Sequence, residues 1–121
     1  TVVPANKMVS LIQHVISIGK RYGFKSVCYG HAGNGNIHVN ILKDNIDEAQ
    51  WHNILKNAVG EIFDEVIRLG GSLSGEHGIG ILNKEFMSKQ FTEVELGLMR
   101  GIKKVFDPKS IMNPGKIFPE Y

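Results

Sequence analysis

Apolar residues recur every three or four positions in the first part of the chain, the spacing that gathers them on one face of a helix. The series is Met8, Leu11, Ile12, Val15, Ile16 and Ile18. Pro4 suits the start of a helix, and Gly23, coming after Lys20 and Arg21, is a typical stop signal. The pattern therefore predicts a helix over about residues 5–22.

Two short runs of strand-forming residues follow, with a segment rich in glycine and asparagine between them. Residues 24–30 and residues 37–42 both carry the β-branched, aromatic and alternating positions of strands. Glycine adopts positive φ at little cost and asparagine tolerates it, so the intervening segment suits a turn. The sequence predicts a β-hairpin with His31 and His38 flanking its loop.

The longest apolar repeat begins near Asp47 and ends near Leu69, and it predicts a second helix. Gly70 and Gly71 end that helix. Its apolar face is formed by Trp51, Ile54, Leu55, Ala58, Val59, Ile62, Phe63, Val66 and Ile67. We assign its acidic cluster to a solvated face: Glu61, Asp64 and Glu65.

Glycine dominates residues 72–82, where only the first few positions suit a strand. Further helices are predicted over about 83–90 and 92–105, and Thr92 with Glu95 forms a capping box at the start of the second. The remaining tail has no regular pattern. Two helices that cover one face of a small antiparallel sheet give an α+β fold.

Composition narrows the function classes. The chain has 121 residues, 42% apolar and 21% charged, which suits one globular domain. Its net charge of +2 is scattered, so nucleic acid is not an expected partner. No run of about eighteen apolar residues indicates a membrane span. The single cysteine, Cys28, favours a reducing compartment, and we expect a cytoplasmic protein that reaches a membrane only through partner subunits.

Three histidines and a glutamate stand out as candidate chemistry. Imidazole and carboxylate donors suit Zn²⁺, Mn²⁺ or Fe²⁺, and three such donors leave coordination positions for a substrate. His31, His38 and Glu76 are the candidate metal ligands. His77 follows Glu76 directly, so in an extended segment its side chain points elsewhere, and it is a candidate general base.

Structural roles account for these residues as well. A histidine in a hairpin is more often a surface or core residue, and glycine-rich loops more often serve the backbone. Spacing alone therefore leaves three functions open: an enzyme site, a metal-binding module without catalysis, and an interaction domain.

Longer motifs add a family resemblance. The chain reads YGHAGNGNIH at 29–38, SGEHGIG at 74–80 and DPKSIMNPGKI at 107–117. These stretches resemble, in the same order, the GHxGDGNxH, SGEHGIG and DPxxxxNPGKI motifs of the C-terminal domain of FAD-linked oxidases with a vanillyl-alcohol-oxidase-type flavin domain. That family includes glycolate oxidase D subunits, D-lactate dehydrogenases and D-2-hydroxyglutarate dehydrogenases.

The resemblance implies a ferredoxin-like cap subdomain and oxidation of a small 2-hydroxy acid to the 2-oxo acid. It implies FAD and a divalent metal, Zn or Mn, as cofactors. The residues that it implies are His31, His38 and Glu76 for the metal, His77 as the base and a substrate contact, Asn36 for the substrate, and Asn113 and Lys116 near the flavin.

The resemblance also implies a partner. Residues 1–121 match the C-terminal domain, and nothing in them resembles the N-terminal domain that holds most of the FAD. We expect that domain in the same parent chain or in a partner subunit, with a homodimer among the assemblies allowed and the chain inactive alone. Three positions depart from the family pattern: Asn34 in place of Asp, Ala5 in place of Arg, and Asn83 in place of Lys.

Overall fold

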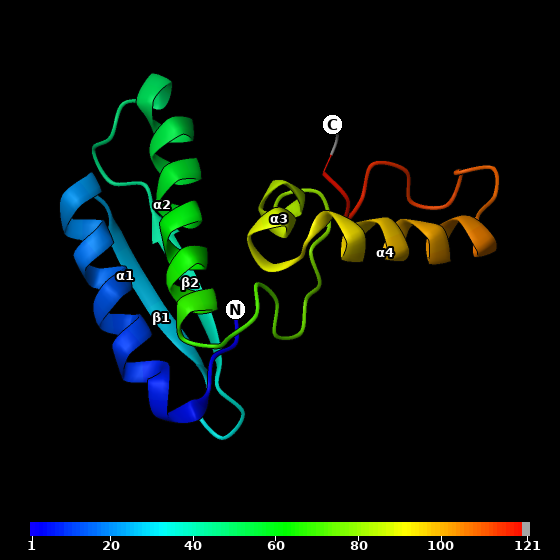
Figure 1. The fold of residues 1–121 in the computed structure, drawn as a ribbon. Helices are drawn as coiled ribbons and strands as arrows, with labels where there is room; N and C mark the ends of the chain where they lie inside the picture. The colour runs from blue at the N-terminus through cyan, green and yellow to red at the C-terminus, as the bar shows by residue number, and fades with distance from the viewer. Residues whose placement is uncertain (120–121) are drawn as a thin grey trace. The chain divides into compact units, whose positions relative to one another are not determined.

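The computed structural model describes residues 1–119, and contacts between residues divide the chain into two compact units (Figure 1). The first unit is Thr1–Glu76, and the second begins at His77. None of the helices within residues 1–119 is long and apolar enough to cross a membrane.

The first unit sets two helices against one face of a β-hairpin (Figure 1). Its elements are η1 (Ala5–Lys7), α1 (Met8–Tyr22), β1 (Lys25–His31), β2 (Asn36–Leu42) and α2 (Glu48–Arg68). They agree with the predicted helices and strands to within a few residues. The α+β class is confirmed by this antiparallel pair and its helices.

The core of this unit lies between the helices and the inner face of the hairpin. Leu11, Val15 and Ile18 from α1 are completely buried, as is Val66 from α2. Ile37 of β2 is 1% exposed and joins the same cluster. The opposite face of the hairpin, here called the outer face, carries half-exposed residues such as Val27, Tyr29 and Leu42.

Single bridges stand where a ferredoxin-like fold has its first and last strands. Val2 bridges Asn36 at the start of β2, and on its other side it bridges Ser72. The order Ser72, Val2, β2, β1 is that of a β-α-β-β-α-β sheet whose first and last strands along the chain are each one residue long. The strand suggested for the residues after 71 is thus a single bridge in the described chain.

One residue of the acidic cluster on α2 is not solvated. Glu65 is 8% exposed, so its assignment to a solvated face is wrong. Arg68 donates to both carboxylate oxygens, each at 2.6 Å, and this two-point contact satisfies the buried charge. Glu61 is half-buried and accepts from Tyr22 of α1 at 2.6 Å, because the two helices pack against each other.

The second unit is helical and ends in an irregular tail. Its elements are η2 (Lys84–Phe86), α3 (Met87–Gln90) and α4 (Glu93–Phe106). The predicted capping box is confirmed: the Glu95 N–H donates to the Thr92 hydroxyl, and the Thr92 N–H donates to the Glu95 carboxylate at 2.7 Å. Leu96 is completely buried on one side of α4.

Candidate metal centre and C-terminal motif

The end of the hairpin places two histidines on its outer face. Tyr29 pairs with His38 across the strands, and His31 lies two residues beyond Tyr29 on the same strand. Because side chains alternate along a strand and cross-strand partners share a face, all three project from the outer face. The rings of His31 and His38 meet edge to face, with centroids 6.1 Å apart.

The two bridges of Val2 bring the segment that carries Glu76 to the same place. Val2 lies between Ser72 and the start of β2, and four residues after Ser72 the Glu76 Oε1 atom lies 2.9 Å from His38 Nε2. Both side chains are partly open to solvent, with 21% exposed for His38 and 44% for Glu76. A carboxylate from a distant segment therefore meets the imidazole.

The predicted ligands form one cluster. His31, His38 and Glu76 each offer one donor atom, and these atoms all lie within 4.8 Å of one another. Two donors that are each about 2.1 Å from one ion lie at most about 4.2 Å apart, and two at right angles lie about 3 Å apart. The 2.9 Å between His38 Nε2 and Glu76 Oε1 suits two donors at right angles around one ion. Donor atoms that lie up to 4.8 Å apart come within the limit of about 4.2 Å after a small movement of their side chains. The donor set fits a divalent cation.

Asn36 pairs with His31 across the strands, and its side chain lies close to Gly75, the residue before Glu76. It is 5% exposed, and its backbone N–H donates to the Asn34 side chain at 3.3 Å. A Cβ atom at Gly75 would lie 2.5 Å from Asn36 Oδ1, so only a glycine fits there undisturbed. The buried amide thus sets the path of the chain immediately before Glu76.

His77 comes directly after Glu76 and is exposed at the start of the second unit. The backbone bends at residues 75–77 and is not extended there. Consecutive Cα atoms are about 3.8 Å apart, so the backbone of His77 stays close to that of Glu76. Its role as a base stays a prediction.

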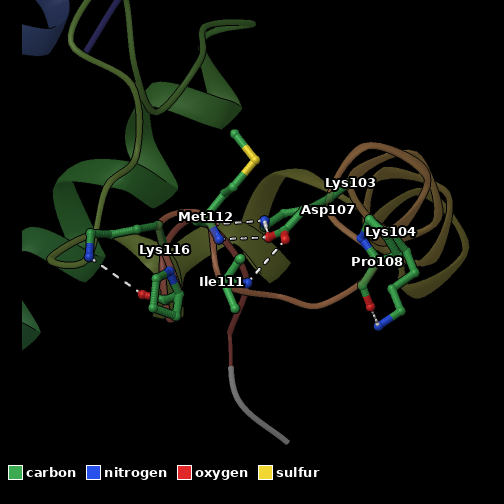
Figure 2. A network of polar contacts seen from close by, with 8 residues as sticks. Lys103, Lys104, Asp107, Pro108, Ile111, Met112 and Lys116 are labelled. Atoms are coloured by element: carbon green, nitrogen blue, oxygen red, sulfur yellow. Dashed lines mark hydrogen bonds and ion pairs between the residues drawn. The ribbon is translucent and has the colours of Figure 1, made fainter.

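The closing DP…NPGK stretch is organised by Asp107, as Figure 2 shows. This side chain is 4% exposed and accepts from the N–H groups of Ile111 and Met112, both at 3.0 Å. Lys103, which also donates to the Met112 carbonyl at 2.9 Å, holds the pKa of the Asp107 carboxyl below its usual range, and the two backbone donors add to this effect. The tail therefore turns back along α4.

That turn presents the two residues predicted to approach a flavin. Asn113 is exposed and has a φ of 47°, a conformation that asparagine tolerates. Lys116 donates to the Pro114 carbonyl at 3.4 Å and lines an open hollow of about 360 Å³ together with Arg100 and Lys104. The hollow is rich in positive charge, and the role of both residues stays a prediction.

Comparison with known proteins decides the family. Residues 1–117 match the family described as FAD linked oxidases, C-terminal domain. The chain belongs to this family. The resemblance carried by the three motifs is therefore confirmed.

Relatives of this FAD-linked oxidase C-terminal domain are much longer proteins. Identity is 33% over 116 residues with a D-lactate dehydrogenase of Anaerostipes hadrus, and 33% over 118 residues with the glycolate oxidase subunit GlcD of Bacillus subtilis (strain 168). It is 36% over 119 residues with a D-2-hydroxyglutarate dehydrogenase of Stutzerimonas stutzeri (strain A1501). Each match covers 96% of this domain but only 24%, 24% and 26% of the relative.

Sequence reasoning missed one residue of the centre in this C-terminal domain. Tyr29 stacks on His38, with ring centroids 5.1 Å apart and ring planes 19° apart. A signal was present, since Tyr29 lies in the predicted strand 24–30 and His31 follows that strand directly, two positions later, where an extended backbone gives the two residues the same face. The cross-strand partner of Tyr29 depends on the hairpin register, which the local sequence pattern does not fix.

Proposed function

We propose that this domain is the metal- and substrate-binding portion of an FAD-dependent oxidoreductase that converts a small 2-hydroxy acid, such as glycolate or D-lactate, into the 2-oxo acid. The observation that carries the proposal is the meeting of His31, His38 and Glu76 in a chain of this family. The names of its relatives, which act on lactate, glycolate and 2-hydroxyglutarate, support the substrate class.

His31, His38 and Glu76 would hold a divalent cation, Zn²⁺ or Mn²⁺, through two imidazoles and one carboxylate. When bound, the cation supplies Lewis acidity toward a substrate hydroxyl, and FAD supplies a hydride acceptor. Three protein donors leave coordination positions for the hydroxyl and one carboxylate oxygen of a 2-hydroxy acid. The partial exposure of Glu76 and His38 supports access of a small molecule to the centre.

His77 is the residue that we propose to accept the substrate's proton. Oxidation of a 2-hydroxy acid removes a proton from the hydroxyl group and a hydride from C2. FAD supplies the hydride acceptor, and a protein base must accept the proton. His77 is covalently next to a proposed ligand, is exposed, and carries an imidazole, the side chain that most often serves as a general base. The same residue would contact the substrate.

We propose that Asn36 helps to position the substrate indirectly, because its side chain holds the segment of Glu76 in place. The burial of Asn36 and its closeness to Gly75 support this role. Asn113 and Lys116 are proposed to approach the flavin. The exposure of Asn113 and the positively charged hollow beside Lys116 support contact with a polar, anionic cofactor.

A separate portion must hold most of the FAD. This domain spans about a quarter of the length of the curated relatives that it matches, which supports a flavin-binding portion outside residues 1–121. We propose that this portion belongs to the same parent chain or to a partner subunit.

The test is flavin reduction in the parent protein that includes the flavin-binding portion. Anaerobic addition of glycolate, D-lactate or D-2-hydroxyglutarate should bleach the flavin absorbance with at least one of them. His77→Ala should slow that reduction by about 10²-fold or more, because general-base catalysis typically contributes that much. The matched control is His52→Ala, an exposed histidine on α2.

Equal rates for His77→Ala and His52→Ala would reject His77 as the base, and a flavin that none of the acids reduces would reject the substrate class. Metal binding without any flavin reduction would favour the second candidate, a non-catalytic metal-binding module. That candidate draws support from the location of all three donors within residues 1–76.

A further inference from the structure

We propose that Tyr29 is a positioning residue for the metal centre: its phenol ring fixes the imidazole of His38 in the orientation that binds the cation. The inference rests on the proposed function, because it takes the cluster of His31, His38 and Glu76 to be a metal site. Tyr29 is not one of the three donors of that cluster.

The contact is a stacked one between cross-strand partners. Tyr29 and His38 lie opposite each other in the hairpin register, and their rings are nearly parallel, 19° apart, with centroids separated by 5.1 Å. An imidazole can rotate about its Cβ–Cγ bond over a broad range unless a neighbour restricts it. A parallel ring at this distance permits sliding of the imidazole in its own plane but resists its rotation out of that plane.

The orientation that Tyr29 favours is the one that the site requires. With the rings stacked, His38 Nε2 lies 2.9 Å from Glu76 Oε1, and the His38 ring stands nearly perpendicular, at 82°, to that of His31. Rotation of the His38 ring would carry Nε2 away from the other two donors. Tyr29 thus reduces the freedom that His38 must lose when a cation binds.

The ring of Tyr29 carries this role, and its hydroxyl does not. The Tyr29 hydroxyl accepts from the Asn40 side chain at 3.5 Å, the outer limit of a hydrogen bond, and the residue is 55% exposed. Such a contact adds little order. Within residues 1–119, the well-aligned contact of Tyr29 is therefore its stack on the His38 ring.

The experiment is calorimetric titration of the metal-free 121-residue chain with Zn²⁺, using four proteins. The first is the unchanged chain. Tyr29→Phe keeps the ring, and Tyr29→Leu removes it while keeping an apolar side chain. Val27→Ala changes the same face of β1 two residues away, where the partner is Asn40, and it is the matched control.

We expect Zn²⁺ affinity within about twofold of the unchanged chain for Tyr29→Phe and Val27→Ala, and about three- to tenfold weaker for Tyr29→Leu. Co²⁺ serves as a second probe, because its visible absorption reports ligand geometry. The Co²⁺ spectrum should shift in Tyr29→Leu and return in Tyr29→Phe, a rescue that general destabilisation of the hairpin would not produce.

Equal Zn²⁺ affinity and an unchanged Co²⁺ spectrum in Tyr29→Leu would overturn this inference and leave the metal site standing. Equal losses in Tyr29→Phe and Tyr29→Leu would also overturn it, since the hydroxyl would then carry the effect. An unchanged chain that binds neither ion would overturn the proposed metal site, and this inference with it.

Discussion

Among single residues, Gly75 stands out because it leaves no room for a side chain of its own beside Asn36. A Cβ at this position would lie 2.5 Å from Asn36 Oδ1 and 3.0 Å from its Cγ, whereas the next atom, Val2 Cβ, would be 3.3 Å away. We therefore predict that Gly75→Ala displaces the Glu76 segment and weakens Zn²⁺ binding by about tenfold or more, the usual cost of disturbing a ligand's support. Calorimetric titration measures the change.

Two further variants isolate the cause. Gly33→Ala is the control, because a Cβ there meets no atom within 4 Å. Asn36→Ala removes the atoms that the new methyl group would strike, so the double variant Gly75→Ala with Asn36→Ala should lose less than the two single losses combined. Strictly additive losses would show that Gly75 matters for another reason, such as the freedom of its own backbone.

Sequence alone identified every donor of the cluster, yet the reason for their meeting lies in long-range pairing. His31 and His38 flank one hairpin loop, so local turn chemistry was enough to predict their proximity. Glu76 reaches them only because Val2 bridges both Asn36 and Ser72, two contacts that no local pattern encodes. Asn36 is a similar case: the motif identified it as a candidate residue, but its burial depends on the same long-range pairing.

At the scale of whole elements, helices and strands were predictable because each has a clear apolar period or turn signal. The burial of Glu65 was not, because it depends on Arg68 supplying both of its hydrogen bonds. The prediction that the tail has no regular secondary structure is confirmed. Its path is held by the Asp107 carboxylate, which accepts from backbone N–H groups four and five residues away. Polar contacts of this kind do not repeat along the sequence, so no periodic pattern predicts them.

The junction between α4 and the tail should be sensitive to acid. In the fold, Lys103 and two backbone donors hold the pKa of Asp107 below its usual value of about 4. A depressed pKa means that this stabilisation is complete above the ordinary pKa and is lost as the pH falls through the folded one. Asp107→Asn should therefore lower the melting temperature at pH 7, and its difference from the unchanged chain should shrink below about pH 4.

Melting followed by circular dichroism between pH 7 and pH 2.5 tests this. Lys103→Met removes the main cause of the depressed pKa, so its acid transition should begin at higher pH than in the unchanged chain. A constant difference between Asp107→Asn and the unchanged chain at every pH would mean that the Asp107 charge contributes nothing to the junction.

On the scale of the whole molecule, the apolar surface that the chain leaves open will govern its behaviour in isolation. Val94, Leu98, Ile102 and Val105 repeat at helical spacing on α4, and each is more than 60% exposed. A continuous apolar stripe of this kind is uncommon on monomeric proteins and favours association. We predict that the isolated chain associates as its concentration rises, and that Leu98→Gln with Ile102→Lys reduces this association while helix content and Zn²⁺ affinity stay unchanged.

Sedimentation at several concentrations measures the association, and Val9→Lys is the control, since Val9 is 67% exposed on α1 and lies outside the stripe. If the stripe drives association, the α4 variant becomes more monomeric and the α1 variant does not. The centre at His31, His38 and Glu76 lies in the first unit and the stripe in the second, so loss of association should leave metal binding intact. A chain that stays monomeric at every concentration would show that the exposed stripe alone is too small to drive self-association.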